Sequence, residues 1–253
     1  MTDKPLILVT NDDGINAVGL DALREALSDL GDVYVVAPDR EASAAGHSIT
    51  LHNLLRINEI SDKVVSIEGT PTDCVLIATL KVLPRKPDLI VSGINRGGNM
   101  GDDVTYSGTV SAALEGTLLD IPSFAISLVT VDRWDFTTSG EFAARLAGEI
   151  FERGLPPTTL LNVNVPDVPR EEIAGVRITR QGRRLYQDEI VEKIDPRGRP
   201  YYWIGAGEPH WRIEPGTDYY AVSNKYISVT PLHIDMTNHE QIPEIRDWNL
   251  AHE

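Results

Sequence analysis

Acidic, hydroxyl and amide side chains in the N-terminal half are of the types that bind a hard metal ion. Asp12 and Asp13 are adjacent, and Asp39, Ser43 and Asn95 lie farther along the chain. Their oxygens suit magnesium or manganese better than a thiolate-type zinc site. Adjacent carboxylates also repel each other unless a cation or a proton neutralises them. The residues predict a divalent-cation site, although an Asp-Asp-Gly sequence alone is more often a turn.

A glycine-rich segment supplies groups that suit phosphate. Residues 93–101 form a longer connection than α/β proteins usually need, and they lead to Ser107 and Thr109. Either residue can cap a helix, whose free amides would bind an anion. A flexible loop with ordinary capping is the alternative. No Walker or dinucleotide fingerprint is present, so kinase-like and oxidoreductase functions lose support.

Two further residues have reactive side chains. His47 could donate to phosphate or move a proton, and a structural hydrogen bond is an equal alternative. Cys74 begins an apolar helical pattern, which favours a buried small hydrophobe over a nucleophile.

Apolar runs that alternate with helical patterns would position these groups. Residues 5–10 and 33–37 predict buried strands, and leucines at helical spacing lie between them. The pattern continues with a strand pair within 48–68, a helix to 83, a strand at 87–92, a helix from about 109, a strand at 123–127, a helix around 142–150 and a strand at 226–231. It predicts a doubly wound, mainly parallel α/β core with its ligands beyond the carboxyl ends of the strands.

Residues of about 176–222 differ from this core. They mix basic and aromatic side chains without a helical period, as in Arg183, Tyr186, Tyr202 and Trp203. We expect hairpins or an extended arm. Nucleic-acid binding is one explanation, and packing against a partner subunit is favoured because the whole chain is acidic.

Length and charge limit the functional classes. The 253 residues suit one enzyme-sized unit, 1–253, and 23 basic against 38 acidic residues give a net charge of −15. Such a surface is expected to repel nucleic acid and acidic membranes. A single cysteine, no signal-peptide pattern and no apolar run of about 20 residues predict a cytoplasmic location without a membrane partner.

Six ordered motifs make the chain similar to the SurE survival-protein family. They are VTNDDGI at 9–15, VVAPD at 35–39, SAAGHSIT at 43–50, GTPTDC at 69–74, SGINRGGNMG at 92–101 and YSGTV at 106–110. TRQ at 179–181 and YYW at 201–203 extend the similarity into the arm.

The resemblance implies a Rossmann-like core and a metal-dependent 5′/3′-nucleotidase or acid phosphatase. It places one divalent cation, Mg²⁺ or Mn²⁺, on the positions matching Asp12, Asp13, Ser43 and Asn95. It also implies a homodimer or tetramer built partly by exchanged C-terminal arms.

The resulting hypothesis is hydrolysis of nucleoside monophosphates by metal-assisted attack of water, with Asp12 and Asp13 as catalytic residues. Asn99, Ser107 and the amides around Gly108 and Thr109 would hold the phosphate oxygens. Three alternatives remain: an aspartyl-phosphate route, a nucleotide-binding regulator with little turnover, and a nucleic-acid-binding module built on the arm.

Overall fold

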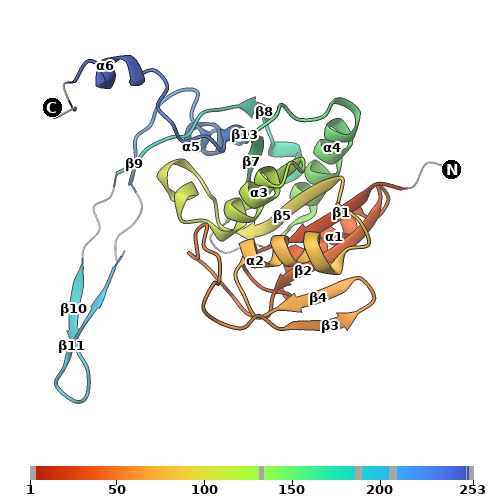
Figure 1. Cartoon of the computed structure of the whole chain (residues 1–253). Helices are drawn as coiled ribbons and strands as arrows, with labels where there is room; N and C mark the ends of the chain where they lie inside the picture. Colours follow the sequence, from red (N-terminus) through yellow and green to blue (C-terminus); the bar gives the residue numbers. More distant parts are fainter. Residues whose placement is uncertain (1–3, 131–133, 186–189, 205–209, 249, 251–253) are drawn as a thin grey trace.

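A central sheet with helices on both faces dominates the structure, a computed structural model that describes residues 4–130, 134–185, 190–204, 210–248 and 250 (Figure 1). Residues 1–3 at the start of the chain and Tyr186 of the expected arm lie outside these ranges. The strands of the sheet are β1 (Leu6–Thr10), β2 (Asp32–Pro38), β3 (Ile57–Ser61), β4 (Val64–Ile67), β5 (Leu89–Arg96), β6 (Ser123–Val129), β7 (Thr159–Pro166), β8 (Gly175–Ile178) and β13 (Tyr226–His233).

The nine strands run in the order β3-β4-β2-β1-β5-β6-β7-β13-β8. Every neighbouring pair is parallel except β3 with β4 and β13 with β7. The mainly parallel α/β sheet predicted from the sequence is therefore confirmed. Because β1 lies between β2 and β5, the residues that follow these three strands emerge side by side at one edge.

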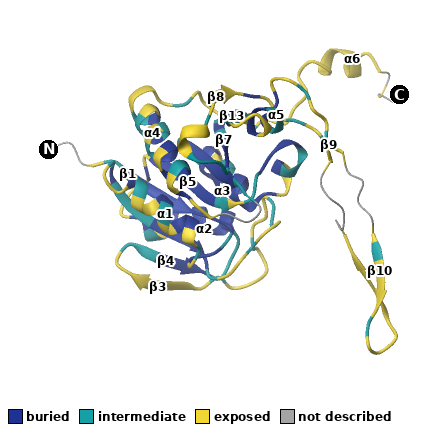
Figure 2. Cartoon of the chain, turned by 180° about the vertical axis from the view of Figure 1, so that it is seen from behind, coloured by how far each residue is buried: buried dark blue, intermediate teal, exposed yellow. Residues whose placement is uncertain are grey.

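Helices cover both faces of the sheet and bury β1 completely (Figure 2). Ile7 and Val9 pack with α1 (Val18–Leu27) and α4 (Thr137–Arg153) on one face. Leu6 and Leu8 pack on the other face, which is covered by α2 (Pro71–Ile77), a π-helical turn (Ala78–Val82) and α3 (Gly108–Leu118). Burial on both faces explains why β1 reads as a continuous apolar run rather than an alternating one.

β7 was not predicted from the sequence, although it lies inside the sheet between β6 and β13. Asn162 and Asn164 interrupt its apolar pattern, and both are fully buried. The strand at 87–92 is also longer than expected, because β5 continues through Arg96. The glycine-rich connection therefore begins at Gly97, not at Gly93.

Residues of about 176–222, where we expect hairpins or an extended arm, begin and end in other elements of the structure. Residues 176–178 belong to β8 of the main sheet, and residues 218–222 lie in α5 (Asp218–Ser223), so a helix occurs where none was expected. This helix has only six residues, too few to show a period, and the Thr217 hydroxyl caps it by accepting from the Tyr220 amide.

Two antiparallel ribbons make up the projecting part of the arm (Figure 1). β9 (Arg184–Leu185) pairs with β12 (His210–Trp211) at its root, and β10 (Val191–Ile194) pairs with β11 (Pro200–Trp203) farther out. A last helix, α6 (Ile242–Arg246), follows the sheet near the C-terminus. No helix among the described residues is long and apolar enough to cross a membrane.

Candidate active site

Three segments meet at the carboxyl ends of β1, β2 and β5. The Asp12 carbonyl accepts a hydrogen bond of 2.8 Å from the Ala42 amide, which brings the segment after β2 against the segment after β1. The Arg96 amide donates to Asp13 Oδ2 at 3.3 Å, which joins the end of β5 to the same place. Ser43 and Asn95 are the sequence neighbours of these contacts, so the predicted metal-binding residues come from adjoining segments.

Asp12 is fastened to the first turn of α3. Its side chain is buried, and Oδ2 accepts from the Thr109 amide at 3.0 Å while Oδ1 accepts from the Thr109 hydroxyl at 2.5 Å. Between them, Gly108 approaches so closely that a Cβ there would lie 2.8 Å from the Asp12 Cβ. Only glycine allows this contact between the carboxylate and the helix.

Burial makes the two carboxylates of this edge costly to ionise. It raises the pKa of Asp12 to about 6, and the neighbouring charge of Asp13 acts in the same direction, while the Thr109 hydrogen bonds oppose the shift. Burial also raises the pKa of Asp13, opposed by the Arg96 amide and guanidinium. A bound cation would stabilise both ionised carboxylates.

The donor set suits a hard divalent cation. Ser43 donates its hydroxyl hydrogen to Glu41 Oε1 at 2.8 Å, and Asn95 Nδ2 donates to the Gly97 carbonyl at 2.8 Å, so lone pairs of Ser43 Oγ and Asn95 Oδ1 stay available. Across the described ranges no three His, Cys, Asp or Glu side chains gather as a metal cluster. A site here would therefore need the hydroxyl and amide oxygens as well as the carboxylates, as magnesium sites allow.

Asp39, another oxygen side chain singled out by the sequence, follows β2. Its Oδ1 is buried and has no hydrogen-bond partner among the described residues. The hydroxyls of Thr10 and Ser92, which are paired across β1 and β5, are also buried and have no hydrogen-bond partner among the described residues. Near the candidate site, this edge of the sheet thus contains three buried oxygens without a hydrogen bond from the described part of the chain.

The predicted phosphate-binding residues lie at the start of α3 and in the loop before it. Ser107 is the helix cap, with Oγ accepting from the Val110 amide at 3.0 Å. Thr109 uses both its amide and its hydroxyl on Asp12. The contacts of the described residues include no acceptor for the Gly108 amide. Gly108 therefore offers the amide that is best suited to an anion.

Asn99 is held by two asparagines of β7 that were not predicted from the sequence as part of the site. Its carbonyl accepts from Asn162 Nδ2 at 2.8 Å and from Asn164 Nδ2 at 2.9 Å, and its amide donates to Asn164 Oδ1 at 2.9 Å. Its side-chain amide donates to Ser127 Oγ at 2.9 Å. The sequence does contain a sign of this role, because Asn162 and Asn164 stand two positions apart in an apolar run. Polar side chains buried in such a strand need hydrogen-bond partners.

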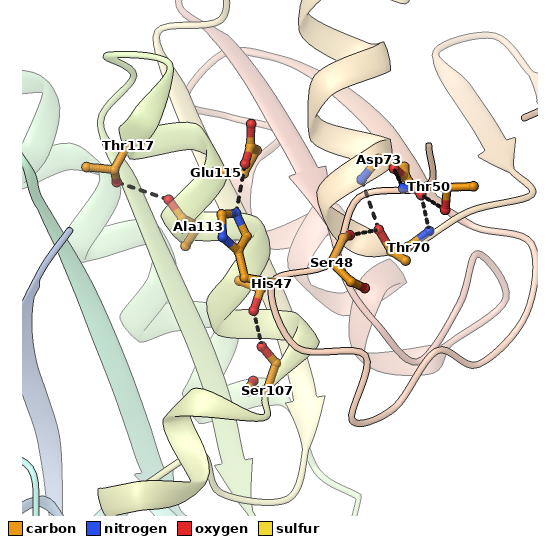
Figure 3. Close-up of polar contacts among 10 residues, drawn as sticks. His47, Ser48, Thr50, Thr70, Asp73, Ser107, Ala113, Glu115 and Thr117 are labelled. Carbon is orange, nitrogen blue, oxygen red and sulfur yellow. Dashed lines mark hydrogen bonds and ion pairs between the residues drawn. The ribbon is translucent and has the colours of Figure 1, made fainter. Parts of the chain in front are cut away.

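The loop that carries Ser43 is anchored to α2 and α3 through its residues His47 and Thr50, whose contacts Figure 3 shows. His47 Nε2 lies 2.7 Å from Glu115 Oε2 of α3, so the structural hydrogen bond considered for His47 is present. On the other side, the buried Asp73 carboxylate accepts from the Thr50 amide and hydroxyl and from the Thr70 amide, at 2.7–2.9 Å. The sequence signal for Asp73 was the Thr-Pro-x-Asp capping box.

Cys74 follows this capping box inside α2. Its thiol is free and fully buried, and burial raises its pKa well above the ordinary value. The predicted burial of Cys74 is confirmed. Its raised pKa keeps the thiol protonated, whereas the thiolate is the reactive form, so the side chain acts as a small hydrophobic group.

A pocket of about 240 Å³ opens beside Asp13. Asn16, Glu41, Arg96 and Trp134 are among its lining residues, and the Arg96 guanidinium lies 4.7 Å from the centre of the Trp134 ring. Space, an aromatic face and hydrogen-bonding groups are thus adjacent to the carboxylates.

The geometry defines an α/β protein with an oxygen-rich crevice beside a helix N-terminus. The chain belongs to the SurE family, since the family model described as "Survival protein SurE" matches residues 7–188. This confirms the resemblance found in the sequence motifs.

Relatives match nearly the whole chain. A protein named 5′-nucleotidase SurE from Geobacter metallireducens is 56% identical over 97% of this chain and 98% of its own length. The protein of the same name from Geobacter sulfurreducens is 55% identical over 97% and 94%. The crystal structure of the SurE protein from Aquifex aeolicus superimposes with a TM-score of 0.87 at 46% identity, covering 96% of this chain and 98% of that one.

Gly108→Ala tests the close contact between α3 and Asp12. The added Cβ must displace Asp12 or the helix start, so we expect Mn²⁺ affinity, measured by calorimetry, to fall at least about tenfold. Gly148→Ala is the matched control, because a Cβ there meets nothing within 4 Å on α4. Equal Mn²⁺ affinity in both variants would contradict the role given to this contact.

Asp12→Asn tests the buried charge. Because the pKa of Asp12 is raised to about 6, the folded protein binds this proton more tightly than the unfolded chain, and ionisation lowers wild-type stability between about pH 4 and 6. Without metal, the unfolding free energy of Asp12→Asn minus that of wild type should rise by on the order of 3 kcal/mol from pH 4 to 7. Urea denaturation in EDTA measures it, with Asp21→Asn on the exposed side of α1 as the control. A difference independent of pH would refute the assignment.

Proposed function

We propose that this chain is a 5′-nucleotidase that hydrolyses nucleoside 5′- and 3′-monophosphates with the assistance of one divalent cation. The names of its relatives, at 51–56% identity over nearly the full chain, support the nucleotidase activity. The observation that carries the proposal is the direct attachment of Asp12 to the start of α3. It joins a cation-binding carboxylate to an anion-binding helix N-terminus.

Asp12, Asp13, Ser43 and Asn95 would hold the cation, either Mg²⁺ or Mn²⁺. All four keep oxygen lone pairs after their protein hydrogen bonds, and the carboxylates are the groups whose burial calls for a positive charge. When bound, the cation supplies Lewis-acid activation of the phosphoryl group and of the attacking water.

The start of α3 and the loop before it would bind the phosphoryl oxygens. The Gly108 amide and the Ser107 turn present hydrogen-bond donors, and Asn99 adds its side-chain amide. In the present arrangement Asn99 Nδ2 faces Ser127 Oγ. Because a serine hydroxyl can accept or donate, the amide can turn over and present its NH₂ group to phosphate without losing that bond.

Water is the better nucleophile for this geometry. Both oxygens of Asp12 are engaged by Thr109, and Asp13 accepts from the Arg96 amide, so neither carboxylate can turn freely toward phosphorus. The same hydrogen bonds hold the carboxylates at fixed positions, where they orient the water and the phosphoryl group for in-line attack.

The pocket beside Asp13 would receive part of the nucleoside. Trp134 offers a ring face to a base, and Asn16 and Glu41 offer hydrogen bonds to sugar hydroxyls.

We further propose that residues 1–253 form one functional unit and that the segment 176–222 includes a subunit contact of a homodimer or tetramer. Tyr202 and Trp203 of β11 are 58% and 62% exposed, and such aromatic side chains are typical of surfaces that a partner covers. The net charge of −15 supports a nucleotide partner over nucleic acid. The buried free thiol of Cys74 is compatible with a cytoplasmic location.

Phosphate release from a panel of 5′- and 3′-nucleoside monophosphates tests the function. We expect no turnover in EDTA, turnover with Mg²⁺ or Mn²⁺, and a loss of at least about 100-fold in Asn95→Ala, which removes a proposed metal ligand. Asn58→Ala, on the exposed strand β3, should behave as wild type.

Two results would contradict the proposal. Equal turnover in EDTA would remove the metal from the mechanism. Nucleotide binding by a folded protein that releases no phosphate with any cation would favour a regulatory nucleotide-binding protein.

A further inference from the structure

The root of the arm and the glycine-rich loop meet at one buried carboxylate, Asp218. This side chain is fully buried at the start of α5. Its Oδ2 accepts from the Gly101 amide at 2.8 Å, and its Oδ1 accepts from the Gly182 amide at 2.8 Å and the Tyr219 amide at 2.7 Å. A buried carboxylate is costly unless donors surround it, and here the donors are backbone amides of separate segments.

Further contacts join the same two segments. Gln181 Nε2 donates to the Gly101 carbonyl at 3.1 Å, so Gly101 is bound through both its amide and its carbonyl. The Arg184 amide donates to Asp102 Oδ2 at 3.0 Å, and its guanidinium contacts both oxygens of Asp103 at 2.8–2.9 Å. The arm root therefore holds three consecutive residues of the loop.

Packing fixes the geometry of this junction. Trp211 of β12 stacks on Tyr219 of α5, with ring centres 4.7 Å apart. A Cβ at Gly101 would lie 2.9 Å from the Trp211 ring and 3.0 Å from the Gly182 carbonyl, and Gly101 has a φ of +53°. The loop thus approaches the arm root at a distance that only glycine permits.

The held segment leads directly to the proposed phosphate site. Gly101 follows Asn99 by two residues and begins the 3₁₀ helix Gly101–Thr105, and Ser107, the cap of α3, comes shortly after it. A displacement of Gly101 would shift chiefly the Asn99 end of this segment, because the contact between Asp12 and Thr109 holds the start of α3 separately.

We propose that Asp218 is a positioning residue of the active site, which sets the loop 97–108 for phosphate binding by tying it to the root of the arm. The inference rests on the proposed function, because it assigns a role toward the phosphoryl group of that reaction. Asp218 acts through Gly101 and does not touch the substrate itself.

Asp218→Asn tests the role, because the asparagine NH₂ group cannot accept one of the amide hydrogens that the carboxylate accepts. We expect the KM for 5′-nucleotides and the inhibition constant of inorganic phosphate to rise about 10- to 100-fold. Mn²⁺ affinity should stay within about twofold of wild type, since the proposed metal ligands follow β1 and β2 or lie in β5.

Asp88→Asn is the matched control. Asp88 also accepts a backbone amide through its carboxylate, from Leu6 at 2.7 Å, but it lies just before β5, at the opposite end of the sheet from the loop. It should leave the KM and the phosphate inhibition constant unchanged.

A merely structural role predicts another result: fewer active molecules, so a lower kcat with KM and the phosphate inhibition constant unchanged. That outcome overturns the proposal. If Asp218→Asn does not fold, Arg184→Met tests the same junction from its outer side, with the same expected rise in KM and the same refuting result. The failure of the proposed function is distinguishable, because wild type would then release no phosphate.

Discussion

The contact between Asp12 and Thr109 is the constraint around which the site is arranged. It brings the end of β1 and the start of α3 so close together that there is no room for a side chain at position 108. It also buries the Asp12 carboxylate, and this burial raises the pKa of Asp12 to about 6. The dipole of α3 and the hydrogen bond from the Thr109 amide each stabilise part of the negative charge of Asp12. The proposed cation, bound to the same carboxylate, would supply the remainder of this stabilisation, and the helix N-terminus beside it would attract the phosphate.

Around this contact, the loops of the site are held by buried polar side chains of neighbouring elements. Asp73 accepts the amide and the hydroxyl of Thr50, in the loop that carries Ser43. Asn162 and Asn164 hold the peptide of Asn99, and Asp218 holds Gly101. Buried hydrogen bonds of this kind are costly to break because the partner is left unsatisfied in a dry environment. These hydrogen bonds thereby fix the loop positions on which the proposed phosphate binding depends.

The sequence predicted the parts of this arrangement that depend on local pattern. The apolar runs of β1 and β2, the helical leucines of α1 and the cap at Ser107 follow from burial and hydrogen bonding that short segments reveal. The pairing of Asp218 with Gly101 spans 117 residues, and that of Asn162 with Asn99 spans 63, so no local signal could show them. β7 was missed because its asparagines face a loop rather than an apolar layer, and α5 because one short turn has no period. Metal binding and phosphate binding by the named residues stay predictions.

The proposed cation site is tested most directly by anomalous diffraction from crystals grown with Mn²⁺. We expect one strong manganese peak at the carboxyl end of β1, within about 2.5 Å of oxygens from Asp12, Asp13, Ser43 and Asn95. A peak bound elsewhere, or none in crystals of a preparation that hydrolyses nucleotides, would contradict it.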